Sequence, residues 1–215
     1  MTPAKRKQNG WADHYTRQAR RDKFAARSAY KLQEIQQKHR VLKRGARVLD
    51  LGCAPGSWLQ LAARSVGPQG RLVGIDLTPV TIDLPDHVTV ITADVADVQG
   101  HLAALGQTRF DVVLSDMAPA TTGNRHVDEA RSIGLCEAAL AVAGQTLVAG
   151  GHFVCKIFQG PDYRSFADSV KIQFERQTAL RPHSTRKASR EVFVIGLGKK
   201  EAAPSCPPGR HTVDP

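Results

Sequence analysis

The stretch Val48-Leu-Asp-Leu-Gly-Cys-Ala-Pro-Gly-Ser-Trp58 decides the fold of this 215-residue chain. It joins a short apolar run, residues 47–51, to a segment of helical length through a turn that contains Gly52 and Gly56. Glycines in such a turn let the backbone pass close to a ligand, and the following helix offers free N–H groups at its N-terminus. The stretch therefore predicts a strand, a ligand-binding turn and a helix.

Strand-like and helix-like segments alternate along the rest of the chain. Further apolar runs of strand length lie at 71–76, 88–91, 110–115 and 152–158, and segments of helical length lie at 27–40, 57–66, 95–105, 127–148 and 163–173. This alternation predicts βαβ units, and hence an α/β fold whose mostly parallel sheet is covered by helices on both faces. No long helix separates the last apolar run, 191–197, from the short run 178–181, so these two are expected to form an antiparallel edge.

Positive charge is concentrated at one end of the chain. Residues 1–44 hold 13 basic and 3 acidic residues, whereas residues 45–215 hold 17 of each. Such a field indicates a polyanionic partner, either nucleic acid or an acidic membrane surface, although a solvated basic tail would give the same count. We divide the chain into a basic arm at 1–26 that is mobile until RNA binds, a folded domain at 27–198, and a disordered tail at 199–215 that is rich in proline and charge.

Several classes of protein are disfavoured by composition. The four cysteines have no paired spacing, and neither they nor the eight histidines suggest a metal site. Isolated cysteines in apolar surroundings indicate a reducing, cytoplasmic location. The most apolar stretch, 138–155, is interrupted by polar residues and is interpreted as a helix followed by a strand, so no membrane span is expected.

The residues around the glycine turn favour S-adenosylmethionine as the ligand. Asp76 ends the second expected strand, where a carboxylate can bind both hydroxyls of a ribose, and Asp94 follows the third, within reach of an adenine edge. The dinucleotide fingerprint is absent, because only Gly52 and Gly56 are present, and this disfavours a nicotinamide dehydrogenase. Asp76 could instead be a helix cap or a loop carboxylate.

Trp58 follows the glycine turn directly. Its position favours a wall beside the cofactor over a plain core residue.

Three charged residues stand where the later strands meet the expected cleft. Asp116 follows the strand at 110–115, Lys156 lies inside the apolar run 152–158, and Glu191 begins the last run. A lysine in an apolar run is costly unless its charge is paired or its pKa is lowered. A structural salt bridge between Lys156 and Glu191 is the alternative to a catalytic role.

These residues carry a resemblance to a known family. The chain resembles the FtsJ/RrmJ family of RNA ribose 2′-O-methyltransferases over about residues 27–198. The most specific segments are Arg27-Ser-Ala-Tyr-Lys-Leu32, Leu51-Gly-Cys-Ala-Pro-Gly-Ser-Trp58, Leu114-Ser-Asp-Met-Ala-Pro119, Cys155-Lys-Ile-Phe-Gln-Gly160 and Ser189-Arg-Glu-Val-Phe193. Cys53 and Ser57 stand where the family often has alanine and glycine, and both are small residues that leave the resemblance intact.

The resemblance implies a Rossmann-like methyltransferase fold with a seven-stranded, mostly parallel sheet whose last strand is antiparallel. It also implies a catalytic tetrad of Lys31, Asp116, Lys156 and Glu191. By the same resemblance the cofactor site comprises Gly56, Trp58, Asp76, Asp94 and Asp116. The implied reaction is methylation of a uridine 2′-hydroxyl in large-subunit (23S) ribosomal RNA on the assembled subunit, by a cytoplasmic monomer that needs S-adenosylmethionine and no metal.

The tetrad suits this chemistry. Methyl transfer from a sulfonium requires the 2′-oxygen to be aligned with the methyl group and its proton to be accepted. A free lysine titrates near pH ~10.4, and we expect the second cation, Lys31, and partial burial to lower the pKa of Lys156. Our hypothesis is that Lys156 is the proton acceptor, that Asp116 orients its amine, and that Glu191 orients Lys31 or the ribose.

RNA binding is expected along the basic arm. The residues that could follow the phosphates are Lys5, Arg6, Lys7, Arg17, Arg20, Arg21, Lys23 and Arg27. The segment 181–190 adds four more basic residues just before Glu191. Trp11 and Tyr15 could stack on bases or anchor the arm to the domain. Of the alternatives, a non-catalytic RNA-binding factor is disfavoured by the intact tetrad, and a methyltransferase acting on a small molecule is disfavoured by the basic arm. A methyltransferase acting on tRNA is not separated from one acting on ribosomal RNA, since phosphate contacts carry no sequence information.

Overall fold

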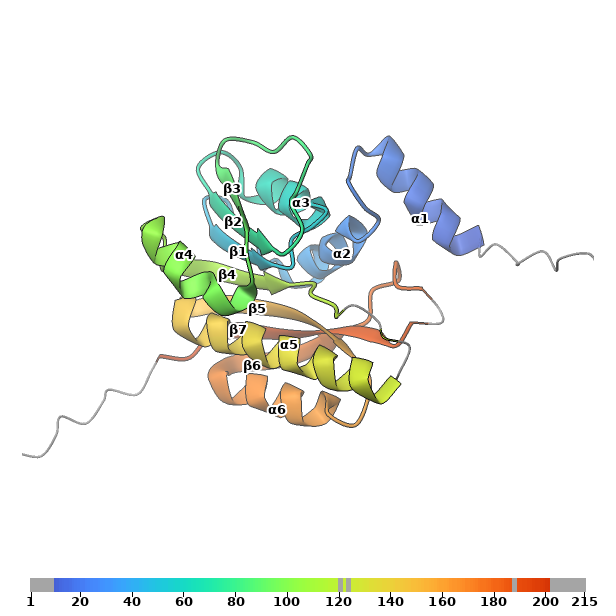
Figure 1. Cartoon of the computed structure of the whole chain (residues 1–215), viewed down its shortest axis with the longest axis vertical. Helices are drawn as coiled ribbons and strands as arrows, with labels where there is room; N and C mark the ends of the chain where they lie inside the picture. The colour runs from blue at the N-terminus through green and yellow to red at the C-terminus, as the bar shows by residue number, and fades with distance from the viewer. Residues whose placement is uncertain (1–9, 120–121, 123–124, 187–188, 202–215) are drawn as a thin grey trace, which may run out of the picture.

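Seven strands form a single sheet in the order β3-β2-β1-β4-β5-β7-β6 (Figure 1). The computed structural model describes residues 10–119, 122, 125–186 and 189–201. The strands are β1 (Arg47–Leu51), β2 (Arg71–Asp76), β3 (Val88–Thr92), β4 (Phe110–Ser115), β5 (Leu147–Phe158), β6 (Phe174–Leu180) and β7 (Glu191–Lys199). The sheet thus extends outward from β1, the strand that precedes the glycine turn.

The pairing of the strands confirms the predicted fold class. Strands β3, β2, β1, β4 and β5 are parallel neighbours, while β7 is antiparallel to both β5 and β6. Strand β7 lies inside the sheet, so β6 alone forms this edge, and β3 forms the opposite one. Because no crossover helix joins β6 to β7, the chain turns back beside itself and the pair is antiparallel.

Helices cover both faces of the sheet (Figure 1). They are α1 (Gly10–Arg21), α2 (Ala29–His39), α3 (Ser57–Val66), the short 3-10 helix η1 (Val95–Asp97), α4 (Val98–Ala104), α5 (Arg125–Thr146) and α6 (Tyr163–Gln173). Apolar residues of α2 and α3 pack on one face of the sheet, and those of α4, α5 and α6 pack on the other. The two clusters form the core, with β1 and β4 between them.

The basic arm contains a helix that the sequence interpretation did not expect. Helix α1 is held near the domain by side-chain contacts: the Tyr15 and Tyr30 rings lie 5.5 Å apart, and Tyr30 Oη donates to Asp22 Oδ2 at 2.6 Å. The sequence interpretation assigned no helix to residues 10–21, whereas the structure forms one there, and the mobility expected of the arm stays a prediction. Residues 1–9 and 202–215, expected to be mobile or disordered, lie outside the described residues.

Several strand boundaries also differ from expectation. Strand β5 begins at Leu147 instead of residue 152, with a shift in its register against β4 between Phe110 and Val112, and β6 begins at Phe174 instead of residue 178. Strand β7 ends at Lys199 instead of residue 197, so the first residue of the expected disordered tail belongs to the sheet. Across the described ranges, no helix combines the length and apolarity that crossing a bilayer would require.

Candidate active site

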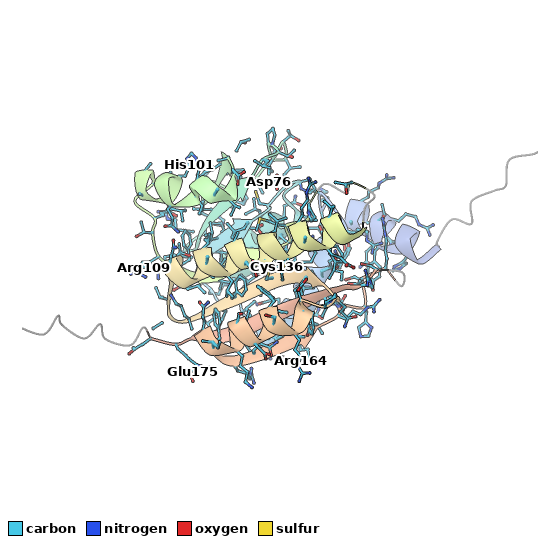
Figure 2. The ribbon with its side chains drawn as sticks, turned by 60° about the horizontal axis from the view of Figure 1, so that its bottom comes forward. Asp76, His101, Arg109, Cys136, Arg164 and Glu175 are labelled. Atoms are coloured by element: carbon cyan, nitrogen blue, oxygen red, sulfur yellow. The ribbon has the colours of Figure 1, made fainter. Side chains whose placement is uncertain are left out.

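A cavity of about 920 Å³ opens at the carboxyl ends of β1, β2 and β4. Its walls come from the β1–α3 turn, the end of β2, the start of η1, the loop after β4 and one face of α5. Asp76, labelled in Figure 2, lies on this wall. The volume falls within the usual range of small-molecule sites, ~300–1,000 Å³, and the position is the expected one for a ligand of a parallel sheet.

Both glycines of the turn adopt backbone conformations that favour glycine. The φ angle is 78° at Gly52 and 105° at Gly56. A Cβ atom on Gly52 would lie 2.6 Å from Cγ of Met117 and 3.0 Å from its Cα, and one on Gly56 would lie 2.6 Å from Ile82. The turn therefore packs directly against the loop after β4 and requires residues without side chains.

Asp76 and Asp94 line the cavity, as expected of cofactor ligands, and both also hold the backbone. Asp76 Oδ2 accepts from the Ala54 N–H at 2.9 Å and Oδ1 accepts from the Thr78 N–H at 2.8 Å. Asp94 Oδ1 accepts from the Ala96 N–H at 2.9 Å and so caps η1. Each carboxylate oxygen has more than one lone pair, so these bonds leave acceptor capacity for ligand hydroxyl and amino groups.

The side chain of Trp58 is a core residue, which corrects the expectation of a wall beside the cofactor. It is 2% exposed, its Nε1 donates to the Ser28 carbonyl at 2.9 Å, and its ring lies 5.6 Å from that of Phe193. The reason is its place on the face of α3 that packs against α2. A cofactor at Trp58 would have to use the backbone N–H, which lies in the first helical turn and lacks an intrahelical partner.

Asp50 lies on β1 beneath the turn and is 1% exposed. Among the described residues, neither of its carboxyl oxygens has a hydrogen-bond partner. Burial, and after it the charges of Asp116 and Asp76, raises the pKa of Asp50 well above the ordinary range of a carboxyl. A raised carboxyl pKa favours folding at low pH, and that contribution is lost as the pH rises through the folded-state pKa.

Replacement of Asp50 by asparagine removes this titration with little change in shape. We expect Asp50→Asn to raise the melting temperature near pH 8 by about 2–4 °C, equivalent to about 1 kcal/mol. The gain should shrink as the pH falls toward ~4, where an ordinary aspartate protonates. Thermal melts of both proteins across this range measure it, and a difference that does not change with pH would contradict the assignment.

Asp111 supplies the matched control. Its hydrogen bond to Arg47 lowers its pKa, so its contribution to stability is present above the ordinary aspartate range and is lost as the pH falls through the lowered value. Asp111→Asn should therefore change stability in the opposite sense. The effect should stay below about 1 kcal/mol because the pair is exposed.

Lys156 and Asp116 form an ion pair at the edge of the cavity. The Lys156 Nζ atom lies 3.0 Å from Asp116 Oδ1 and donates a hydrogen bond to the Asp116 carbonyl at 2.5 Å. Lys156 is 8% exposed, while Asp116 lines the cavity. Asp116 Oδ1 is buried, and among the described residues its partner is the Lys156 ammonium.

Lys31 and Glu191 form a second ion pair. The Lys31 Nζ atom lies 2.7 Å from Glu191 Oε1 and donates to Oε2 at 2.8 Å. Both side chains are largely buried, with 13% and 10% exposed. Glu191 thus pairs with Lys31, and the structural alternative of a Lys156–Glu191 bridge is not the pairing that these side chains adopt.

Phe193 brings the two ion pairs together. In the β5–β7 ladder Lys156 is opposite Phe193, and Glu191 is opposite Phe158. Directly opposed residues share a face, as do residues two apart on a strand, so Lys156, Glu191 and Phe193 lie on the same side of the sheet. Lys31 approaches from α2, with its Nζ 5.9 Å from the centre of the Phe193 ring. The four predicted residues therefore converge on the α2 side of the sheet.

The sequence interpretation missed residues that support this cluster. Glu34 on α2 and Thr185 before β7 contact the segment that leads into Glu191. Glu34 follows Lys31 by three positions in the expected helix. This spacing puts the two side chains on the same helix surface and could have indicated Glu34. The cavity wall also includes Met117, which lies in the motif at 114–119, and Arg131 and Leu135, which no motif indicated.

The described part of the basic arm presents a cationic surface. His14, Arg17, Arg20 and Arg21 line a shallow cavity on α1. Tyr15 contacts Tyr30, which favours an anchoring role, whereas the side chain of Trp11 and all of Lys5, Arg6 and Lys7 lie outside the described residues. Over the described ranges, no group of three or more histidine, cysteine or acidic residues could hold a metal ion.

Known proteins resemble this chain in sequence. The model of the FtsJ-like methyltransferase family matches residues 24–199. A ribosomal RNA large subunit methyltransferase E from Desulforapulum autotrophicum is 54% identical over 91% of this chain and 97% of its own length. A protein of the same name from Bdellovibrio bacteriovorus is 48% identical over 87% of this chain and 97% of its own.

Solved structures resemble it in fold. A ribosomal RNA methyltransferase from Plasmodium falciparum superposes with a TM-score of 0.72 at 26% identity, covering 82% of this chain and 98% of that one. Fibrillarin from Aeropyrum pernix, solved with S-adenosylmethionine, gives a TM-score of 0.56 at 17% identity over 73% of this chain and 68% of its own. The second likeness supports the Rossmann-like fold alone. From the family match and the extent of these identities, the chain belongs to the FtsJ-like methyltransferases.

Proposed function

We propose that this protein transfers a methyl group from S-adenosylmethionine to the 2′-hydroxyl of a uridine in large-subunit ribosomal RNA, on the assembled subunit, as a monomer in the cytoplasm. Relatives named ribosomal RNA large subunit methyltransferase E support the RNA substrate. The single observation that carries the proposal is the Lys156–Asp116 ion pair, because Asp116 lines a ligand-sized cavity and Lys156 shares a face of the sheet with Glu191 of the second pair.

The cavity suits the proposed cofactor. Asp76 and Asp94 place carboxylate oxygens where ribose hydroxyls and an adenine amino group would need acceptors. Asp116 adds a third carboxylate to the cavity wall and is paired with Lys156. When bound, S-adenosylmethionine supplies a methyl group on a positively charged sulfur, which is a good leaving group.

The two ion pairs provide a proton acceptor and orienting charges for the ribose hydroxyl. A ribose hydroxyl is a very weak acid, so its proton must be accepted as the bond to the methyl group forms. We assign Lys156 as the proton acceptor and Asp116 as the group that orients its amine, because the two are in direct contact at the cavity edge. Lys31, fixed by Glu191, adds a second cation that orients the ribose.

A basic surface leads toward this cluster. Arg20 and Arg21 lie on α1, and Arg27 lies between α1 and α2. Burial, and after it the charge of Arg186, lowers the pKa of Arg27, and Arg27 Nη2 donates to the Ser184 carbonyl in the segment before β7. We infer that RNA phosphates lie along this surface while one ribose enters the site.

Mapping of ribose methylation tests the proposal. Ribosomal and transfer RNA from cells with and without this protein would be compared for 2′-O-methylated positions. We expect one uridine of the large-subunit RNA to lose its methyl group, and purified protein with S-adenosylmethionine to restore it on isolated large subunits. Loss of a methyl group from tRNA instead, or no change at any position, would refute the assigned substrate or the enzymatic role.

A further inference from the structure

The segment between β6 and β7 contains buried polar side chains, which are unusual in a surface connection between two strands. We call residues 181–186 the β6–β7 loop. Ser184 is fully buried and Thr185 is 5% exposed. Within the described residues, the buried Ser184 Oγ and Arg27 Nη1 atoms have no hydrogen-bond partner. Buried polar groups without partners cost stability, and proteins retain them mainly where function requires the arrangement.

One carboxylate holds the backbone of this loop. Glu34 on α2 accepts from the His183 N–H through Oε2 at 2.6 Å and from the Ser184 N–H through Oε1 at 2.9 Å. Arg27 secures the same point from the other side, since its Nη2 donates to the Ser184 carbonyl at 2.6 Å. Hydrogen bonds to charged groups are shorter and stronger than neutral ones. Glu34 on α2 and Arg27, just before α2, therefore both fix the backbone of the loop.

The loop in turn contacts the catalytic cluster. The Thr185 hydroxyl donates to Glu191 Oε1 at 3.3 Å, and Glu191 binds Lys31 through both oxygens. Lys31 and Glu34 are three positions apart on α2, and such residues are neighbours on a helix surface. The contacts form a closed ring that runs from Glu34 through the loop and Glu191 to Lys31 and back along one turn of α2.

We propose that Glu34 is a positioning residue for methyl transfer: by holding the β6–β7 loop on α2, it fixes Glu191 and so the Lys31 ammonium. The inference rests on the proposed function, because it assigns Lys31 and Glu191 to the reaction. Glu34 touches neither the cofactor cavity nor Lys156. Its effect should therefore fall on the catalytic step and leave cofactor binding unchanged.

The test uses Glu34→Gln in the full-length protein. Glutamine keeps the shape but places an amide NH₂ against one of the two backbone N–H groups. We expect kcat to fall about tenfold, because a small displacement of a catalytic group is costly, while the Kd for S-adenosylmethionine stays within about twofold. Glu175→Gln is the matched control, because Glu175 is exposed on β6 and lies across the molecule from Asp76 (Figure 2). It should behave as wild type.

A double-mutant cycle separates positioning from general destabilisation. If Glu34 acts through Glu191, adding Glu34→Gln to Glu191→Gln should lower the rate by less than about twofold. Thr185→Val should reduce the rate in the same non-additive way. Amide hydrogen exchange at residues 183–186 should quicken in Glu34→Gln, which reports on the loop independently of activity.

Two outcomes would overturn the inference: wild-type kcat in Glu34→Gln, or losses that add fully to those of Glu191→Gln. A wild-type protein without methyltransferase activity would instead refute the proposed function. The hydrogen-exchange result does not depend on activity and would still report whether Glu34 holds the loop. If Glu34→Gln fails to fold, Thr185→Val carries the cycle, and additivity with Glu191→Gln would again reject positioning.

Discussion

Lys156→Arg is expected to lower the rate of methyl transfer by about a thousandfold, the usual scale for loss of a proton-transfer group. Arginine keeps the positive charge beside Asp116, but its guanidinium does not give up a proton in proteins. The variant therefore separates electrostatic orientation from proton transfer. Lys156 contacts both the carboxylate and the carbonyl of Asp116, so arginine retains partners for its charge.

Single-turnover methylation of isolated large subunits measures the effect, and calorimetric titration with S-adenosylmethionine checks the cofactor site. The affinity should stay within about threefold of wild type, because Lys156 does not line the described cavity. Lys171→Arg is the matched control, since Lys171 lies exposed in the last turn of α6. A wild-type rate for Lys156→Arg would mean that Lys156 is not the proton acceptor.

The strands and helices that the sequence predicted best are those with strong local patterns. Strands β1, β2 and β4, and helices α3 and α6, begin and end where their apolar periodicity does. Helix α1 was not predicted, because its stability depends on Tyr15 contacting Tyr30 and on Tyr30 bonding Asp22. Such contacts join distant residues and leave no mark on the local pattern of a basic, polar segment.

Residue type and strand position indicated Asp116, Lys156 and Glu191, and the family resemblance added Lys31, but whether Glu191 pairs with Lys31 or with Lys156 was left open. Strand-end positions were enough to place Asp76, Asp94 and Asp116 at one cavity, because carboxyl ends of parallel strands meet at one edge. The pairing of Lys31 with Glu191 depends on the register of β5 against β7, which no motif specifies. Trp58 shows the same limit. The motif predicted that it follows the glycine turn, but the direction of its side chain depends on how α2 and α3 pack together.

Asp116→Asn is expected to lower the rate of methyl transfer by at least about a hundredfold, since it removes the carboxylate that orients the proton acceptor. Asp116 is the residue of the tetrad that lines the cavity, so affinity for S-adenosylmethionine should also weaken, by about three- to tenfold. Single-turnover rates and calorimetric titration measure the two effects separately. Asp111→Asn, on the strand that precedes Asp116, removes an exposed ion pair and should leave both unchanged.

Stability gives Asp116 a second test. Its removal leaves the largely buried Lys156 ammonium without a carboxylate, a change that commonly costs about 3 kcal/mol. The double variant Asp116→Asn/Lys156→Met removes both charges and should recover most of this loss, because replacing both members of a buried pair is often nearly neutral. Thermal melts should therefore show restored stability while methyl transfer stays undetectable. A double variant that methylated RNA would show that the ion pair is not required for the reaction. A double variant as unstable as Asp116→Asn would show that the unpaired charge of Lys156 does not cause the loss of stability.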